Sequence, residues 1–292
     1  VLVVGEAMIE LSSAGDGLLS WTFAGDTLNC AAALGAANRA ARVLYLTGVG
    51  EDRISREFID FCSRLGIDAS SSPIVPERHL GLYWISTEGT DRSFQYWRNE
   101  SAARQVLRSA VEVPPPGDFA AVIFSNITLA VSGPGAALLL GRIESLREMG
   151  ALVGFDVNYR PALWPDVATA RTAAEEAAAI ADVVVASADD VAALWGDTAK
   201  GFCTKMASAG VATTIVTAGS GPVVALSDGK LLQVQPPAVP VVDATGAGDA
   251  FFGTYLGNRL SGYTDGDAIV RAVEVAATVV GSPGALNYLL NP

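Results

Sequence analysis

The stretch from Val241 to Gly253, VVDATGAGDAFFG, constrains the fold of this chain more than any other segment. Prolines within residues 236–240 precede it and exclude a helix at that point. From Ala247 onwards the sequence takes on helical spacing, with apolar side chains at Phe251, Phe252, Tyr255 and Leu256. The glycines at 246 and 248 are therefore expected at a helix start, where the first backbone N–H groups lack an intrahelical acceptor.

A helix start of this composition is suited to binding an anion. Two glycines allow a ligand to approach the backbone closely, and the helix dipole favours negative charge there. Asp249 follows in the first turn, where a carboxylate is placed to deprotonate an alcohol beside a phosphoryl group. The alternative interpretation is an ordinary glycine-rich turn in which Asp249 only complements the helix dipole.

The nine residues from Asp243 to Phe251, DATGAGDAF, closely resemble the C-terminal signature of the ribokinase-like (pfkB) family of carbohydrate kinases. By this resemblance Asp249 is the catalytic base. Three backbone amides then hold the transferring phosphate, those of Gly246, Ala247 and Gly248. The resemblance also implies that Thr245 and Asp243 support the loop. Thr245 would lie on the nucleotide side, and Asp243 near the site where some members bind a monovalent cation such as K⁺.

Composition narrows the class of protein. The length of 292 residues allows one α/β domain with a small appendage, or two domains. The net charge of −12 argues against non-specific nucleic-acid binding, and it means that an anionic substrate needs a local basic patch. No apolar run reaches transmembrane length, so no membrane partner is expected. Three cysteines without metal-ligand spacing, and no visible signal peptide, favour a reducing, cytoplasmic location.

The apolar runs predict alternating strands and helices. Buried strands are predicted at residues 1–5, 43–48, 120–124, 152–156, 183–186 and 213–217. Helices are predicted at about 26–39, 52–65, 133–149 and 166–180. The 52–65 helix carries one apolar face, made of Ile54, Phe58, Phe61 and Leu65. The proline run Pro114–Gly117 predicts a break. This alternation favours a doubly wound, mostly parallel sheet flanked by helices.

A second match to the same family lies near the N-terminus. Gly25, Asp26 and Asn29 cluster at the mouth of the first predicted helix. The alternative is a capped helix packed by small residues. The cluster resembles the family's glycine-rich N-terminal signature, and by that resemblance the aspartate and the asparagine bind sugar hydroxyls.

Between residues 67 and 98 no helix is predicted. Leu80–Ser86 and Ser93–Arg98 are rich in aromatic residues and flank a loop at 87–91, a pattern typical of a β-hairpin. We expect a small antiparallel sheet that projects from the core, built from about residues 8–24 and 70–100, like the lid of this family. An assembly of identical chains through this lid is also expected. The single histidine, His79, is expected at the edge of the sheet and is given no catalytic role.

Two common nucleotide-binding motifs are absent from the sequence. No GxGxxG follows the first strand, and no GxxxxGK[ST] occurs, so neither a Rossmann dinucleotide site nor a P-loop is expected. A nucleotide would therefore bind at the start of the helix near Ala247.

Two segments resemble the branch of the family that phosphorylates 2-keto-3-deoxygluconate. One is DVNYR at Asp156–Arg160, followed by Leu163 and Trp164, and in that branch the arginine reaches the sugar acid. The other is YWRNESAA at residues 96–103, with GLY at 81–83. The resemblance places four side chains at the substrate, those of Tyr83, Tyr96, Arg98 and Arg160.

An arginine pair suits a carboxylate, because guanidinium groups form bidentate, charge-assisted hydrogen bonds with it. A neutral sugar, by contrast, would leave a buried arginine without a partner. The alternative for the arginines of this region is that they are solvated surface charges: Arg92, Arg98, Arg104 and Arg108.

Two segments depart from the family pattern. The family has Asn-x-x-Glu near its magnesium–phosphate water network, whereas this chain has SADD from Ser187 to Asp190. Asp190 can still offer oxygens to magnesium-bound water. The family's Lys-x-Gly-x-x-Gly becomes TAGSGP at residues 217–222, without the lysine. We expect the nucleotide to lie near Ser187, Thr217, Gly219 and Gly221.

The sequence therefore predicts an ATP- and Mg²⁺-dependent kinase that phosphorylates a sugar acid, 2-keto-3-deoxygluconate, at its primary hydroxyl. A fructokinase, or another sugar or nucleoside kinase of the family, is the first alternative. The second is a non-catalytic sugar-binding homologue, against which the intact Asp249 and glycine turn argue.

Overall fold

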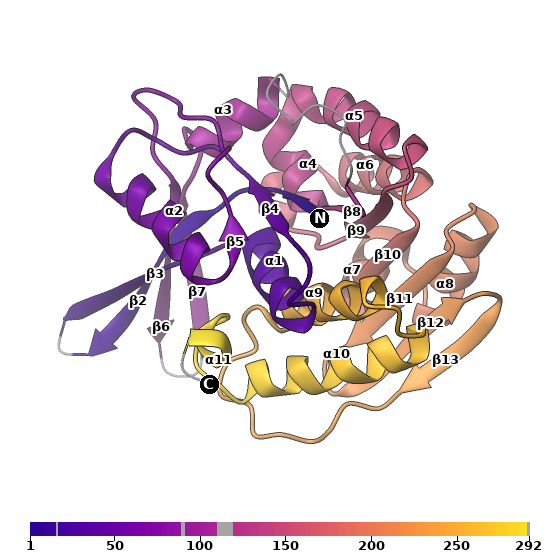
Figure 1. Cartoon of the computed structure of the whole chain (residues 1–292). Helices are drawn as coiled ribbons and strands as arrows, with labels where there is room; N and C mark the ends of the chain where they lie inside the picture. Colours follow the sequence, from indigo (N-terminus) through magenta and orange to yellow (C-terminus); the bar gives the residue numbers. More distant parts are fainter. Residues whose placement is uncertain (16, 89–90, 110–118, 291–292) are drawn as a thin grey trace.

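The fold is built around one large sheet. The computed structural model describes residues 1–15, 17–88, 91–109 and 119–290. The predicted proline break at 114–117 lies outside these residues. The sheet has nine strands, most of them parallel, with β12 and β13 added antiparallel at one edge (Figure 1). In spatial order they are β13 (Lys230–Val234), β12 (Gly221–Ser227), β11 (Thr213–Ala218), β10 (Val183–Ser187), β9 (Leu152–Asp156), β8 (Ala121–Ser125), β1 (Leu2–Val4), β4 (Val43–Leu46) and β5 (Ile67–Asp68).

Helices cover both faces of this sheet (Figure 1). The core on one face is shared with α1 (Asp26–Ala37), α2 (Arg53–Arg64), α9 (Ala247–Leu260) and α10 (Asp265–Val280). The core on the other face is shared with α3 (Ala102–Ser109), α4 (Asn126–Ser132), α5 (Ala136–Glu148), α6 (Val167–Ala179), α7 (Ala188–Trp195) and α8 (Ala199–Ser208). A short helix, α11 (Asn287–Leu290), packs beside α10.

The continuous apolar runs of the sequence are explained by this two-sided burial. In β8, Val122 and Phe124 belong to the core on one face, whereas Ile123 belongs to the core on the other. A parallel strand between two helix layers has no solvated side, so every position is apolar. The doubly wound fold class predicted from the sequence is confirmed.

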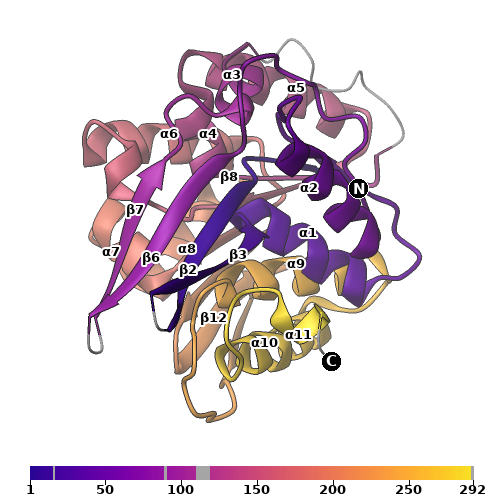
Figure 2. The ribbon, with the colours of Figure 1, turned by 90° about the vertical axis from the view of Figure 1, so that its left-hand side faces the viewer.

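A second, four-stranded sheet projects from the N-terminal side of the core, and Figure 2 shows its strands side by side. Its order is β3 (Leu18–Ala24), β2 (Met8–Gly15), β6 (Gly81–Glu88) and β7 (Asp91–Trp97). The pairs β2–β3 and β6–β7 are antiparallel hairpins, but β2 and β6 pair in parallel. The predicted small antiparallel sheet is therefore present as two hairpins, and these join through one parallel pair because the chain passes through β4 and α2 before it returns to this sheet.

Most predicted helices and strands are present within one or two residues of their predicted ends. On the predicted apolar face of α2, Phe58 and Phe61 are buried, whereas Ile54 in the first turn is 39% exposed. The hairpin of β12 and β13 was not predicted. None of the helices within the described ranges is long and apolar enough to cross a membrane.

Candidate active site

A cavity of about 780 Å³ lies at the carboxyl ends of the parallel strands, between the large and the small sheet. Strand ends meet there because successive strands of a doubly wound sheet run in the same direction. It gathers most of the predicted site residues: Gly25, Asp26, Asn29, Tyr83, Tyr96, Arg98, Arg160, Ser187, Asp190, Thr217, Thr245, Gly246, Gly248 and Asp249. Four predicted residues are not part of its lining: Gly219, Gly221, Asp243 and Ala247.

The start of α9 forms one wall of the cavity. Gly246 precedes the helix with a φ of 78°, in the left-handed region that favours glycine. A Cβ at this position would also lie 2.4 Å from the Cβ of Ala285, so a larger residue does not fit without a shift. Gly248 has open space where a Cβ would be. Gly246 and Gly248 both line the cavity, whereas the N–H group of Ala247 donates to the carbonyl oxygen of Ala244 at 3.3 Å. The start of α9 therefore borders the cavity at two glycines, a position where helix N–H groups can bind an anion.

Asp249 lies in the first turn of α9 and is half-buried at the cavity. The side-chain amide of Asn29 donates a 2.8 Å hydrogen bond from Nδ2 to Oδ2 of Asp249. Burial, and then the negative charge of Asp26, raise the pKa of Asp249 to about 7. A carboxylate with such a pKa can accept a proton near neutral pH, which is the property that a general base needs.

Three further carboxylates surround Asp249: those of Asp26, Asp156 and Asp190. Burial raises the pKa of Asp156 well above its ordinary value, and the charges of Asp249 and Asp190 add to this effect. Burial also raises the pKa of Asp190. The cavity is therefore acidic and favours an incoming cation, although among the described residues no group of three or more His, Cys, Asp or Glu is arranged to hold a metal ion.

Asp26 is held in place from two strand ends. It accepts hydrogen bonds from Oγ of Ser125, at the end of β8, and from Nδ2 of Asn158 at 3.3 Å, just after β9. Asn158 has a φ of 24°, outside the usual range for a side-chain-bearing residue. Such a strained position is typical of functional loops, because the surrounding contacts must hold it.

Arg98 already has a partner, which the sequence analysis did not foresee. Its Nε donates to Oε2 of Glu6 at 2.8 Å, and its Nη2 donates to the same oxygen. Ser101 donates to the other oxygen of Glu6, and the side chains of Arg98 and Glu6 are 6% and 0% exposed. The premise that a buried arginine here needs a substrate carboxylate was therefore wrong for Arg98, because Glu6 neutralises its charge.

A similar pairing holds Tyr83. Its hydroxyl donates to Oε2 of Glu10, and the two residues face each other on neighbouring strands β6 and β2. Burial and the nearby Glu10 charge raise the pKa of Tyr83 above its usual value, so the phenol stays protonated. Tyr96, the neighbour of Tyr83 on β7, packs its ring 5.8 Å away. Both aromatic side chains line the cavity.

Arg160 differs from Arg98 because it is exposed and lines the cavity at the end of β9. Its Nη1 donates to the carbonyl oxygen of Tyr159 at 3.0 Å. Burial raises the pKa values of Asp156, Asp190 and Asp249, and the positive charge of Arg160 partly opposes this rise. Within the described residues Arg160 has no ion-pair partner, so its charge is available to a ligand.

The side chains expected near the nucleotide lie at the ends of β10 and β11. Ser187 caps α7, accepting a 3.0 Å hydrogen bond from the N–H of Asp190. The hydroxyl of Thr217 donates to the carbonyl oxygen of Ala186 at 3.4 Å. Gly219 lies in the turn between β11 and β12 with a φ of 57°, and Gly221 is the first residue of β12. They lie beyond the cavity lining.

Asp243 joins two loops beside the start of α9. Its oxygens accept backbone N–H groups of Thr245 at 2.9 Å and of Gly284 at 3.0 Å. It faces a separate hollow of about 590 Å³ between the small sheet and residues 283–290, which Glu10 also lines. The predicted supporting role of Asp243 therefore has a geometric basis, while its role toward a cation stays a prediction.

Arg104 and Arg108 of α3, and His79 of the predicted lid region, do not line the cavity. Arg108 is exposed, and Arg104 is half-buried with a 3.2 Å hydrogen bond from Nη1 to Oδ1 of Asn99. The side chain of Arg92 lies outside the described part. His79 is exposed and its Nδ1 lies 3.0 Å from Oδ2 of Asp52, which caps α2.

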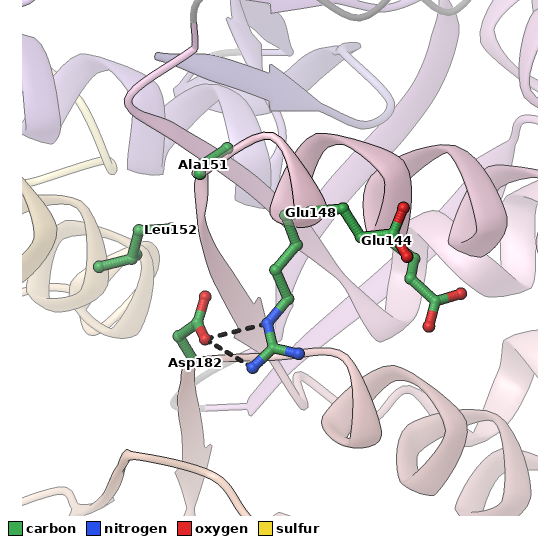
Figure 3. Close-up of a pocket in the computed structure, with 7 residues that line it drawn as sticks. Glu144, Glu148, Ala151, Leu152 and Asp182 are labelled. Carbon is green, nitrogen blue, oxygen red and sulfur yellow. Dashed lines mark hydrogen bonds and ion pairs between the residues drawn. The ribbon is translucent and has the colours of Figure 1, made fainter.

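A hollow of about 490 Å³ lies at the opposite edge of the sheet, where β9 and β10 begin (Figure 3). An ion pair between Arg147 and Asp182 closes one side of it, with distances of 2.9 and 3.0 Å. Its other charged residues, Glu144 and Glu148, point outward from α5 (Figure 3). Ligands of doubly wound folds bind at the carboxyl ends of the strands, so we assign no site here.

Sequence reasoning missed Glu6 and Glu10. One signal for Glu6 was present, since it is a charged residue only two positions after a buried strand. Glu10 lies within β2 between apolar neighbours, where an acidic residue is uncommon. Their partners, however, are 92 and 73 residues away along the chain and no local pattern identifies them.

An anion-binding helix start beside a carboxylate that is basic near neutral pH is suited to phosphoryl transfer to an alcohol. A family model described as "pfkB family carbohydrate kinase" matches residues 1–291. The chain belongs to this family and is a carbohydrate kinase.

Individual relatives give more detail. The chain is 33% identical to the 2-dehydro-3-deoxygluconokinase of Escherichia coli (strain K12) over 98% of its own length and 96% of that protein. Among solved structures, a PfkB protein from Polaromonas sp. JS666 matches with a TM-score of 0.86 at 22% identity, covering 100% of this chain and 99% of that one. A putative ribokinase II from E. coli, in complex with ATP and Mg²⁺, matches with a TM-score of 0.84 at 20% identity, covering 98% and 94%. These two structural matches establish the fold.

Proposed function

We propose that this carbohydrate kinase transfers the γ-phosphoryl group of ATP to the primary hydroxyl of 2-keto-3-deoxygluconate, which is the same sugar acid as 2-dehydro-3-deoxygluconate. The observation that carries the proposal is the half-buried Asp249, with a pKa of about 7, beside the glycine-lined start of α9. The identity of 33% to a 2-dehydro-3-deoxygluconokinase over nearly the whole chain supports the choice of sugar.

Asp249 acts as the base in this proposal. Its carboxylate takes the proton of the primary hydroxyl, the freed oxygen attacks the γ-phosphorus in line, and the bond to the β-phosphate oxygen breaks to release ADP. The N–H groups of Gly246, Ala247 and Gly248 at the start of α9 would donate to the charge that develops on the phosphate. For Ala247 this requires its N–H group to leave the carbonyl oxygen of Ala244, to which it donates at 3.3 Å. A fixed donor array of this kind favours the transition state without reorganising.

The acidic cavity fits a nucleotide that arrives with a divalent cation. Asp190 and Ser187 offer carboxylate and hydroxyl oxygens, which suit Mg²⁺ through bound water. The chemistry that Mg²⁺ supplies when bound with ATP is neutralisation of phosphate charge. A structural relative in complex with ATP and Mg²⁺ supports this pairing. Thr217, Thr245 and the turn of Gly219 and Gly221 would lie toward the nucleotide, and Asp243 beside a monovalent cation such as K⁺.

The sugar acid would lie between α1 and the small sheet. Arg160 would hold its carboxylate, since its charge is exposed at the cavity. Gly25 and Asp26 border the same space and would meet sugar hydroxyls, together with the phenols of Tyr83 and Tyr96. The charge of Arg98 is paired with Glu6, so Arg98 would not bind the sugar carboxylate directly. It would instead help to hold the ring of Tyr96, whose centre lies 5.7 Å from the guanidinium carbon.

The small sheet would act as a lid and as a contact between identical chains. Its cavity face carries Tyr83 and Tyr96, while Leu19, Trp21 and Trp97 lie on the opposite face and are 52%, 49% and 57% exposed. Phe94 and Tyr96 on the cavity face are 44% and 46% exposed as well, and the exposed apolar side chains of the opposite face favour burial against a partner. Light scattering coupled to size exclusion, with Trp97→Ser as the variant, tests this: a monomeric unmodified protein would contradict it.

The test of the proposed function is an assay of ADP release with ATP and MgCl₂ and a panel of 2-keto-3-deoxygluconate, fructose and ribose. We expect the highest kcat/KM with 2-keto-3-deoxygluconate and a phosphorylated sugar acid by mass spectrometry. A higher kcat/KM with fructose would establish the fructokinase alternative, and no turnover with any sugar would favour the non-catalytic one.

A further inference from the structure

Helices α1 and α9 pack in close backbone contact just beyond their first turns, which border the cavity. A Cβ on Gly253 would lie 2.1 Å from the carbonyl oxygen of Cys30, and one on Gly257 would lie 2.8 Å from that of Leu34. Only glycine permits backbones to approach so closely. This contact places the first turn of α1, with Asn29, against the first turn of α9, with Asp249.

Within this contact the amide of Asn29 has a fixed orientation. Its Nδ2 donates to Oδ2 of Asp249 at 2.8 Å, and only the NH₂ side of an amide can donate to a carboxylate. Asn29 is 5% exposed, and its Oδ1 is fully buried with no hydrogen-bond partner in the described part of the chain. That acceptor does not reach the cavity. In this arrangement the amide contacts Asp249, whereas the family resemblance assigned it to a sugar hydroxyl.

We propose that Asn29 is a positioning residue for the base, and that its amide holds Oδ2 of Asp249 so that Oδ1 is turned toward the substrate hydroxyl. The inference rests on the proposed function, in which Asp249 takes the proton. Holding one oxygen removes a rotational freedom of the carboxylate, and the donated hydrogen bond stabilises its ionised form, which is the form that accepts a proton.

The charges around Asp249 show why this donor matters. Titratable groups within electrostatic reach come from α1, the end of β9, the small sheet and α11: Asp26, Cys30, Asp156, Arg160, Tyr83 and Tyr288. Burial and Asp26 raise the pKa of Asp249, while the hydrogen bond from Asn29 and the charge of Arg160 lower it. Without the amide, Asp249 is left with burial and Asp26 opposed by Arg160 alone, so its ionised form becomes rarer at neutral pH.

The test is the pH dependence of kcat/KM, measured as ADP release with ATP, MgCl₂ and 2-keto-3-deoxygluconate. Asn29→Leu keeps the approximate shape and removes the donor, and Asn29→Asp adds a like charge beside Asp249. The matched control is Asn258→Leu, the same change at another asparagine of 5% exposure, whose Nδ2 donates at 2.8 Å to the carbonyl oxygen of Thr254 on α9. Any change in the protonation of ATP or of the sugar with pH affects all variants equally, so a difference between their profiles comes from the protein.

We expect the acidic limb of the profile to move upward by about one pH unit in Asn29→Leu, because a hydrogen bond to an ionised group is worth about one to two pKa units. Asn29→Asp should move it further, because two adjacent carboxylates share a proton. Activity then recovers at high pH, the KM for the sugar changes little, and Asn258→Leu keeps the original midpoint. An equal loss at every pH would overturn the inference as a merely structural effect, and a raised sugar KM without a shift would return Asn29 to sugar binding.

A second measurement does not depend on turnover. The free energy of unfolding by urea is measured at pH 6 and pH 9. The effect of Asn29→Leu is determined twice, once in the otherwise unmodified protein and once in a protein that also carries Asp249→Asn. Losing the donor raises the folded-state pKa of Asp249 further, so the destabilisation by Asn29→Leu should grow as pH rises through about 7, and only where Asp249 is present. A pH-independent difference in both backgrounds overturns the inference. If Asp249→Asn had normal turnover but the pH-dependent effect of Asn29→Leu still required Asp249, the role of Asp249 as the base would be refuted. The hydrogen bond between Asn29 and Asp249 would still be supported.

Discussion

Binding of the substrate carboxylate should depend on the charge of Arg160, which has no ion-pair partner among the described residues, and not on the charge of Arg98. The two arginines were expected to act as a pair, but Arg98 is buried against Glu6, while Arg160 is exposed at the cavity. We predict that Arg160→Ala raises KM for 2-keto-3-deoxygluconate with a smaller effect on kcat. A contact with a carboxylate that takes no part in the chemistry exists in the ground and transition states alike, so its loss weakens both equally.

The size of this effect follows from exposure. A hydrogen bond to a charged group is worth roughly 1.5–3 kcal/mol, and an exposed guanidinium belongs at the lower end because water competes for it. The expected change in KM is therefore about tenfold. Fructose lacks the carboxylate, so its KM should stay unchanged and the selectivity ratio between the two sugars should fall about tenfold. Arg171→Ala, an exposed arginine of α6 outside the cavity lining, is the matched control.

Arg98→Ala should mainly lower the stability of the fold. It leaves Glu6 buried, with Ser101 as the one donor that remains of those described. Breaking a buried ion pair by removing one partner typically costs about 3–5 kcal/mol, which urea unfolding measures directly. If Arg160→Ala left the selectivity ratio intact, or if Arg98→Ala changed selectivity without loss of stability, the assignment of roles to the two arginines would be refuted.

Three further changes test the base, the anion site and the lid. Asp249→Asn should keep sugar and nucleotide binding but lower kcat by ~10²–10⁴, measured by ADP release with calorimetric binding as the control; parent-like turnover would exclude Asp249 as the base. Gly246→Ala should destabilise the protein and reduce activity because of its φ of 78° and the Ala285 contact, whereas Gly248→Ala, with open space at its Cβ, should unfold at the parent temperature. Hydrogen exchange of residues 81–97 should slow when the sugar binds, because a closing lid excludes water; identical protection with and without sugar contradicts closure.

Local sequence patterns were sufficient for most of the core. The strand at 152–156 was predicted at its observed bounds, because a short apolar run ends at Asp156 where the chain leaves the sheet. The edge hairpin of β12 and β13 was missed. β12 begins with Gly221 and Pro222, which are typical of a turn, and β13 has no buried residue that would mark it as a core strand. Parallel pairing of β2 with β6 was also beyond a local pattern, because it depends on the path of the 56 residues from Gly25 to Leu80 that separate β3 from β6.

For the site, the sequence identified residues better than it identified their partners. The cavity lining contains Asp249, Asp26 and Arg160, each of which was named from a motif. The partners of Arg98 and Tyr83 were not predicted. Glu6 comes close to Arg98, and Glu10 close to Tyr83, only when the small sheet assembles. A sequence resemblance identifies residues at their positions in the chain, whereas their hydrogen-bond partners can lie far away in the sequence.

The protonation of Asp249, the proposed base, illustrates this difference most clearly. The signature DATGAGDAF is local and fixes which carboxylate lies at the start of α9. The pKa of that carboxylate depends on Asp26, and on Asn29, which is 220 residues away from Asp249 in sequence. Both reach it only because glycines 253 and 257 let α1 and α9 touch. If Asp249 is the base as proposed, a chain that kept the signature but placed larger residues at this helix contact would keep that carboxylate and lose the hydrogen-bond donor that favours its ionised form.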